Sequence, residues 1–237
     1  MNTILDVGFK KLETEKEDKV AIIDYNLGNL FSVYHACASL GYNPKITNQK
    51  TDVIDADYLI LPGVGAFGDA MDTLKRLDLV APIKEYIATG KPFLGVCLGL
   101  QLLFTESEEF GNHKGLNIVE GVVHKFPSID KMGNILKVPQ IEWNQIFLTD
   151  KTKWEKSPLN CCKNGDFMYF VHSYYVLPSN KSVVLSTTTY GLEYCSSIIS
   201  NNIFACQFHP EKRGNMALKS IKVFLVKTCM HSEYFSN

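Results

Sequence analysis

The stretch Pro92-Phe93-Leu94-Gly95-Val96-Cys97-Leu98-Gly99-Leu100-Gln101-Leu102-Leu103-Phe104 decides how the rest of the chain is interpreted. Its apolar first half predicts a buried strand that ends at Cys97, and Leu98 to Phe104 predicts a helix. Gly95 and Gly99 flank the cysteine and allow a tight strand-to-helix turn. This is the arrangement of a nucleophile elbow, in which the N–H groups at a helix start favour the thiolate.

A second motif, Phe208-His209-Pro210-Glu211, supplies a candidate base. Alone, Cys97 could equally be a core cysteine, because free cysteine is among the most buried residue types. Pro210 favours an extended backbone at His209, and residues two apart in an extended chain point the same way. Glu211 can therefore lie beside the imidazole. Together with Cys97, these residues predict a triad of nucleophile, base and orienting carboxylate.

The composition limits the classes of protein to which the chain can belong. The chain has 237 residues, 46% hydrophobic content and a net charge of -1, which suits one domain with a sizeable core and gives no basic surplus for nucleic acid or an acidic membrane. No apolar run approaches the ~20 residues that cross a bilayer. Seven cysteines without framework spacing and the lack of a signal peptide favour reduced thiols and a cytoplasmic location. We expect no metal and no cofactor, because the cysteines lack zinc-site spacing.

The first half of the chain alternates short apolar runs with helical segments. We expect strands at 20–24, 44–47 and 58–61, and helices at 30–40, 69–77 and 80–89. This alternation predicts an α/β fold with an open, mostly parallel sheet flanked by helices. In such sheets functional residues gather at the carboxyl ends of the strands, so Cys97 and the glycine-rich loop Pro62–Gly68 are expected to be neighbours. The charged residues 1–19 predict a loosely ordered extension before a single domain at 20–237.

The second half is rich in β-strand patterns. We expect strands at 116–126, 168–176, 183–189, 193–199 and 203–208. Helical crossovers are missing between these strands, so antiparallel pairing is expected in this half. An amphipathic pattern predicts a final helix at 216–229.

Several motifs together resemble a known family. Gly95-Val96-Cys97-Leu98-Gly99-Leu100-Gln101 and Gln207-Phe208-His209-Pro210-Glu211-Lys212 resemble the motifs of the class I, or triad, glutamine amidotransferases. The resemblance narrows to the glutaminase subunits of imidazole glycerol phosphate synthase, and it covers Val20 to about Val226. The segments that narrow it are Asp24-Tyr25-Asn26-Leu27-Gly28-Asn29, Leu61-Pro62-Gly63-Val64-Gly65-Ala66-Phe67 and Tyr169-Phe170-Val171-His172-Ser173-Tyr174.

The resemblance implies hydrolysis of L-glutamine to glutamate and ammonia. Cys97 would attack the carboxamide and form a thioester, and His209 would carry the proton to the leaving ammonia. The oxyanion would be bound by the backbone N–H of Leu98 and by the Gly63-Val64 backbone, where glycine lets a peptide rotate.

The resemblance also implies which residues hold the substrate. Gln101 and Glu109 would lie on one side of the glutamine, and Ser173 and Tyr174 near its other end. From the residues alone, Gln101 could be a surface helix residue and Glu109 part of a solvated acidic turn. His172, inside an apolar strand, is better explained as a hydrogen-bonded core residue than as the base.

The family passes its ammonia to a (β/α)8-barrel cyclase, which makes imidazole glycerol phosphate and AICAR in histidine biosynthesis. This chain has no eightfold βα pattern, so the barrel would be a separate subunit of a heterodimer. Asn29, Trp143, Tyr169 and Lys212 match family positions that face the barrel. From the residues alone, Trp143 could also be a half-buried core residue.

Two positions depart from the family's usual sequence. Gln140 stands where a histidine is usual, and Glu142 where a glycine is usual. Glutamate is costly at positive φ and adds a charge near the expected partner face. A second hypothesis is therefore open, in which the ammonia forms an amidine on a nucleotide-linked sugar for a surface polysaccharide. The intact Cys97, His209 and Glu211 argue against a third, a non-catalytic scaffold.

Overall fold

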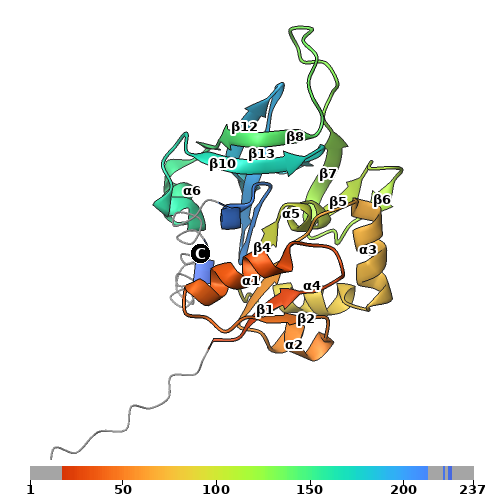
Figure 1. The fold of residues 1–237 in the computed structure, drawn as a ribbon, viewed down its shortest axis with the longest axis vertical. Helices are drawn as coiled ribbons and strands as arrows, with labels where there is room; N and C mark the ends of the chain where they lie inside the picture. The colour runs from red at the N-terminus through yellow and green to blue at the C-terminus, as the bar shows by residue number, and fades with distance from the viewer. Residues whose placement is uncertain (1–17, 213–220, 222–223, 226–237) are drawn as a thin grey trace, which may run out of the picture.

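The computed structural model describes residues 18–212, 221, 224 and 225. Its ribbon shows a central sheet with helices packed against it, crossed by a separate two-stranded ribbon and topped by a projecting loop between β7 and β8 (Figure 1). Most of the extension expected at 1–19 and of the helix expected at 216–229 lies outside the described residues. No helix in the described part of the chain is long and apolar enough to cross a membrane.

The first half forms the parallel part of the sheet, as expected. The strands are β1 (Val20–Ile23), β2 (Lys45–Thr47), β3 (Tyr58–Leu61) and β4 (Phe93–Val96), in the order β2-β1-β3-β4. The helices that connect them are α1 (Leu30–Ser39), α2 (Lys50–Asp55), α3 (Phe67–Arg76) and α4 (Val80–Ala88). The mostly parallel sheet, the three early strands and the three expected helices are thus confirmed, whereas α2 was not expected.

Helices cover both faces of this part of the sheet, so its inner strands are apolar throughout. In β1, Ala21 and Ile23 pack in a core with α3 and α4, whereas Val20 and Ile22 pack in a second core with α1. Every residue of β1, β3 and β4 is buried. This is the pattern expected of parallel strands that are covered on both sides.

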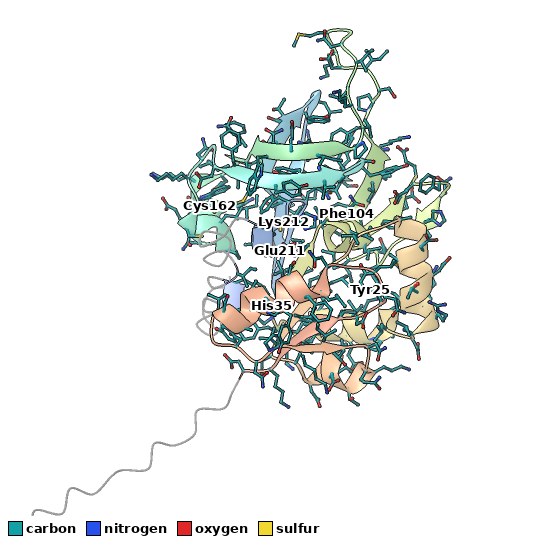
Figure 2. All side chains as sticks on the ribbon, in the orientation of Figure 1. Tyr25, His35, Phe104, Cys162, Glu211 and Lys212 are labelled. Carbon is teal, nitrogen blue, oxygen red and sulfur yellow. The ribbon has the colours of Figure 1, made fainter. Side chains whose placement is uncertain are left out.

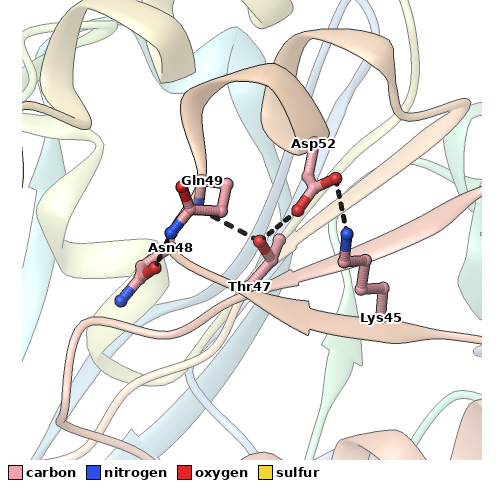
Figure 3. A network of polar contacts seen from close by, with 5 residues as sticks. All are labelled: Lys45, Thr47, Asn48, Gln49 and Asp52. Carbon is pink, nitrogen blue, oxygen red and sulfur yellow. Dashed lines mark hydrogen bonds and ion pairs between the residues drawn. The ribbon is translucent and has the colours of Figure 1, made fainter.

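Helix α2 is held by a polar network instead of a long apolar face (Figure 3). Asp52 accepts hydrogen bonds from Lys45 Nζ at 2.8 Å and from Thr47 Oγ1 at 2.5 Å. These two hydrogen bonds lower the pKa of the Asp52 carboxyl. Thr47 Oγ1 in turn accepts from the Gln49 N–H, just before the helix. The network joins the start of α2 to β2 and explains a helix that hydrophobic periodicity did not reveal.

The second half extends the same sheet. Its elements are β5 (Phe104–Ser107), β6 (His113–Lys114), β7 (Val119–Lys125), β9 (Phe147–Leu148), β11 (Tyr174–Pro178), β12 (Val184–Tyr190), β13 (Leu192–Ser200) and β14 (Ile203–Cys206), with α6 (Lys151–Glu155) and the 3-10 turns η1 (Pro158–Cys161) and η2 (Lys181–Val183). The order continues from β4 as β14-β13-β11-β7-β5-β6. Pairing is mostly antiparallel, as expected, but β14 is parallel to β4 and β5 is parallel to β7.

The segment expected as one strand at 168–176 is two strands in different sheets. β10 (Phe167–His172) pairs with β8 (Gln140–Gln145) in a separate antiparallel ribbon, and the chain turns at Ser173 into β11 of the main sheet. Because β8 was not expected, no separate partner was predicted for β10. The expectation of a single strand was therefore wrong.

The helix after the elbow is shorter than expected. α5 (Leu98–Leu102) ends before Phe104, which begins β5. The carbonyl of Leu102 accepts from the Leu116 N–H at 2.8 Å, and that of Leu103 accepts from the N–H groups of 118 and 119. These long-range backbone hydrogen bonds replace the next helical turn.

Candidate active site

Cys97 lies on a sharp turn between β4 and α5. Its φ is +56° and its ψ is -108°, a conformation that costs a non-glycine residue on the order of 1–3 kcal/mol. Its N–H donates to the Cys206 carbonyl at 2.8 Å, which joins the elbow to the end of β14. Gly99 passes so close to β3 that an added Cβ would lie 1.8 Å from the Leu61 carbonyl oxygen. The structure therefore has the strained, closely packed turn that the glycines predicted.

Gly99→Ala is expected to lower the free energy of unfolding by at least about 3 kcal/mol. The overlap is with a backbone oxygen of a central strand, so no side chain can move to relieve it. Urea denaturation would measure the loss. Gly90→Ala is the control, because Gly90 has a φ of +79° but open space around it, and it is expected to cost about 1–2 kcal/mol. Equal losses in both variants would contradict the steric argument.

His209 and Glu211 form a buried pair. His209 Nδ1 lies 2.8 Å from Glu211 Oε1, and both side chains are almost fully buried. The expected reason for this contact was wrong, because Pro210–Lys212 forms a 3-10 turn (η3) instead of an extended segment. The turn brings the two side chains together across the proline. In Figure 2, Glu211 and Lys212 lie between α1 and the β8–β10 ribbon.

The surroundings of His209 favour its charged form. Burial lowers its pKa, but Cys97 and Glu211 raise it more, so that it lies at about 10 against an ordinary value of 6.5. Nε2 of His209 is buried and makes no conventional hydrogen bond within the described part of the chain. The nitrogen that does not face Glu211 is thus available to the sulfur of Cys97. The structure brings together all three residues of the predicted triad.

A cavity of about 280 Å³ opens beside Cys97, slightly below the usual range for small-molecule sites. It is lined by all four residues expected to hold the substrate and by two of the expected oxyanion residues. These are Gln101, Glu109, Ser173, Tyr174, Val64 and Leu98. Residues from both halves of the chain therefore meet in one hollow at the carboxyl end of β4.

Gln101 and Glu109 are held in defined positions. Gln101 is buried, and its Nε2 donates to the Tyr174 carbonyl at 3.1 Å. Glu109 Oε2 accepts from the Phe67 N–H at the start of α3 at 2.6 Å. Burial and the nearby Asp69 raise the Glu109 pKa, although the Phe67 hydrogen bond opposes this shift. Gln101 is therefore a buried residue and not a surface residue. Glu109 is partly buried and hydrogen-bonded, so it does not belong to a fully solvated acidic turn.

The two backbone segments expected to bind the oxyanion lie next to each other. However, Gly63 presents its carbonyl to the Leu98 N–H, and a carbonyl cannot bind an anion. The carbonyl of Gly63 accepts from the Leu98 N–H at 3.4 Å. The preceding peptide is held by Tyr25, whose hydroxyl donates to the Pro62 carbonyl at 2.8 Å. At Gly63 an added Cβ would lie 2.0 Å from that hydroxyl. In this structure the Leu98 N–H is therefore already hydrogen-bonded. It becomes free to bind an oxyanion only if the Gly63-Val64 peptide turns.

His172 is the hydrogen-bonded buried residue that the sequence favoured. Its Nδ1 lies 2.7 Å from the Tyr174 carbonyl, and its Nε2 lies 3.3 Å from the Tyr194 hydroxyl. Burial lowers its pKa to about 4. With this low pKa the imidazole is a poor acceptor for the proton of Cys97, although the residue does line the cavity.

Three of the four residues expected to face a partner form one cluster. Trp143 on β8 and Tyr169 on β10 are direct cross-strand partners with ring centroids 5.6 Å apart. Lys212 Nζ lies 4.3 Å from the centroid of the Tyr169 ring, within the range of a cation–π interaction. Trp143 is 48% exposed, so it is a surface residue. Asn29, also exposed, precedes α1, which contacts η3.

The unusual residues of β8 fit a regular strand. Glu142 pairs with Phe170 in the β8–β10 ribbon and does not have a positive φ, so the expected strain is absent. Gln140 is fully buried, where its Oε1 accepts from the Tyr194 hydroxyl at 2.9 Å. Glu142 Oε1 accepts from Gln140 Nε2 at 3.2 Å and from Asn144 Nδ2 at 3.1 Å. Both departures from the usual sequence are thus satisfied locally.

The elbow cysteine, the buried His–Glu pair and the cavity beside Cys97 are the features of a cysteine amidotransferase site on an α/β fold. This chain belongs to the class-I glutamine amidotransferases, because the model of the family "Glutamine amidotransferase class-I" matches residues 21–227.

Named relatives narrow the comparison. The chain is 47% identical over 207 residues to imidazole glycerol phosphate synthase subunit HisH of Syntrophotalea carbinolica, covering 86% of this chain and 98% of the relative. It is also 47% identical to subunit HisH of Aquifex aeolicus, covering 87% and 95%. A crystal structure titled glutamine amidotransferase shares the fold, with a TM-score of 0.67 and 16% identity over 89% of this chain and 99% of that one.

Proposed function

We propose that this chain is the glutaminase subunit of an imidazole glycerol phosphate synthase. It hydrolyses L-glutamine and delivers the ammonia to a separate (β/α)8-barrel cyclase, with which it forms a cytoplasmic heterodimer acting in histidine biosynthesis. The observation that carries the proposal is the Cys97 elbow beside the buried His209–Glu211 pair, in a chain 47% identical to HisH subunits over nearly their whole length.

The proposed chemistry follows from the geometry of the three residues. His209 holds the proton of Cys97, and Glu211 stabilises the resulting imidazolium through Nδ1. The Cys97 thiolate attacks the glutamine carboxamide, and His209 then protonates the departing ammonia. Water, deprotonated by His209, hydrolyses the thioester and regenerates the thiolate. No metal or cofactor is needed for any of these steps.

The Gly63 carbonyl offers a means of control over this reaction. Its hydrogen bond to the Leu98 N–H leaves the oxyanion without that donor. One donor to an oxyanion contributes roughly 3–4 kcal/mol to lowering the barrier. Rotation of the Gly63-Val64 peptide would free the Leu98 N–H and turn a second N–H to the same place. The proposed enzyme is therefore slow until partner binding turns the peptide.

The substrate site is the cavity beside Cys97. Glu109, whose carboxylate faces the cavity, would bind the α-amino group of glutamine together with Gln101. Ser173 and Tyr174, which also line the cavity, would bind the α-carboxylate. These roles are proposals that rest on the position of each residue around the cavity.

The proposed partner face is one side of the β8–β10 ribbon. Ile141, Trp143 and Phe167 lie on this side with Tyr169, and the first three are exposed. Lys212 adds a positive charge over the Tyr169 ring. Exposed aromatic residues next to a cation are typical anchors of a protein interface. The face also lies next to His209, whose N–H donates to the Tyr169 carbonyl at 3.0 Å.

The proposal is tested by measuring glutamate release by the full chain mixed with the histidine-pathway cyclase of the same organism, with and without the cyclase's nucleotide substrate. Stimulation by the nucleotide supports the proposal. No stimulation, with Cys97 still labelled by a thiol-reactive glutamine analogue, would assign the glutaminase to another partner, such as a sugar-amidine synthase. No labelling in the presence of the partner would favour the non-catalytic scaffold.

Trp143→Ala is expected to weaken binding to the cyclase by roughly 30- to 1,000-fold, because an exposed central aromatic residue is a typical hot spot. Titration calorimetry with the purified cyclase would measure the change. Leu177→Ala, at an exposed leucine of β11, is the control and should leave the affinity unchanged. Equal affinity for the Trp143 variant and the parent chain would exclude this side of the ribbon as the partner face.

A further inference from the structure

A buried glutamine outside the predicted triad contacts the sulfur of Cys97. Gln207 follows β14 and is fully buried, and its Nε2 lies 3.6 Å from Cys97 Sγ. Its Oε1 accepts from Gln101 Nε2 at 3.0 Å. Its backbone N–H donates to the Ser196 carbonyl at 2.9 Å. Both ends of the Gln207 side chain and its main chain are thus held by hydrogen bonds.

The direction of the Gln207 amide follows from its neighbours. The Tyr174 carbonyl can only accept, so the group of Gln101 that faces it must be the NH2 group. The second hydrogen of that NH2 group then points to Gln207, whose side-chain oxygen must accept it. The NH2 group of Gln207 is therefore the end that faces the sulfur. This argument removes the usual ambiguity between the two ends of an amide.

The sulfur has a different partner for each of its protonation states. Val171 presents a carbonyl oxygen 4.0 Å from Sγ, and a carbonyl can accept only from the thiol. Gln207 presents N–H on another side, and an N–H group stabilises the thiolate. His209 takes up the proton that distinguishes the two states.

We propose that Gln207 is a catalytic residue of the glutaminase, because its side-chain N–H donates to the Cys97 thiolate, stabilises the anion and fixes the direction of its attack. The proposal rests on the proposed role of Cys97 as the nucleophile. Gln101 acts through Gln207 as a positioning residue, in addition to its proposed contact with glutamine.

The test is the pH dependence of Cys97 alkylation by iodoacetamide, followed by mass spectrometry of the peptide that contains Cys97. Gln207→Leu removes the donor at similar volume, and the midpoint of the alkylation profile should move up by about one to two pH units. Gln207→Glu keeps the shape but places a carboxylate near the sulfur, so it should move the midpoint further.

The other titratable groups around the sulfur are unchanged in all variants, so they cancel in the comparison. They are His209, Glu211, Tyr25, Cys206, His172, Glu109 and Tyr174. Gln49→Leu is the matched control, because the Gln49 side chain bonds only to its neighbour Asn48 among the contacts drawn in Figure 3. It should leave the profile unchanged.

Urea denaturation of each variant would separate loss of the thiolate contact from loss of the fold. A profile that is unchanged in folded Gln207→Leu, or in Gln207→Glu if the leucine variant unfolds, would overturn the role of Gln207. Failure of the proposed function gives a different result, in which Cys97 of the parent chain is not labelled by a glutamine analogue when the partner is present. A purely structural role for Gln207 would lower stability without moving the midpoint.

Discussion

Replacing Cys97 with alanine is expected to lower the partner-stimulated rate of glutamine hydrolysis by roughly 10⁴-fold or more. The substitution removes the atom that attacks the carboxamide, and no other described thiol reaches the cavity lining. Glutamate release under saturating glutamine, with the cyclase and its nucleotide present, would measure the change. Binding to the cyclase should be unchanged, because Cys97 is buried and exposes almost no surface to a partner.

Cys37→Ala is the matched control for this prediction. Cys37 is a buried thiol of α1, and burial raises its pKa to about 12, so it stays protonated and unreactive at neutral pH. Its removal should affect stability slightly and leave the rate unchanged. Retained hydrolysis in Cys97→Ala, or equal loss in Cys37→Ala, would contradict the proposed nucleophile.

Glu211→Gln is expected to lower the same rate by roughly 10²- to 10⁴-fold while leaving the fold intact. The carboxylate holds Nδ1 of His209 at 2.8 Å and is one of the two groups that raise the pKa of His209 to about 10. An amide of the same shape removes this charge. Cys97 alone then opposes the effect of burial, so the His209 pKa falls and less imidazolium forms near neutral pH.

The same substitution should change how stability depends on pH. The folded-state pKa of His209 lies above its ordinary value, so its stabilising contribution is complete below about pH 6.5 and is lost as the pH rises through about 10. Urea denaturation between pH 6 and pH 10 should show this fall in the parent chain and a smaller one in Glu211→Gln. Glu106→Gln, at an exposed ion pair with Lys114, is the control and should cost less than about 1 kcal/mol. A parent chain whose stability does not fall over this range would contradict the raised pKa.

The first half of the fold was predictable because its signals are local. Strand β3, helix α4 and the elbow are each encoded within about a dozen residues by apolar runs, helical periodicity and glycines. The errors arose where distant segments decide the local structure. The expected helix at Leu98–Phe104 is cut short by backbone hydrogen bonds from residues 116, 118 and 119. The expected strand at 168–176 divides at Ser173 because its two parts pair with different sheets.

The site was predictable to a similar extent. Cys97 and the His209–Glu211 pair were found from local motifs, and the cavity residues were found through the family resemblance. Gln207 lies inside one of the quoted motifs, but no local pattern indicates that its amide reaches a sulfur 110 residues away. The contact between Lys212 and Tyr169 could not be predicted from the sequence either, because it depends on the 3-10 turn that replaced the expected extended segment.

The sequence by itself determined the parallel α/β core, the cysteine elbow and the identity of the three triad residues, because spacing and side-chain chemistry specify these within short segments. Only the tertiary structure decided which hydrogen bonds connect the residues of the site. It placed the Gly63 carbonyl against the Leu98 N–H, aimed the Gln207 amide at the sulfur, and removed the strain expected at Glu142. These features depend on which backbone and side-chain groups from separate strands meet in a buried space, where a polar group without a partner is costly.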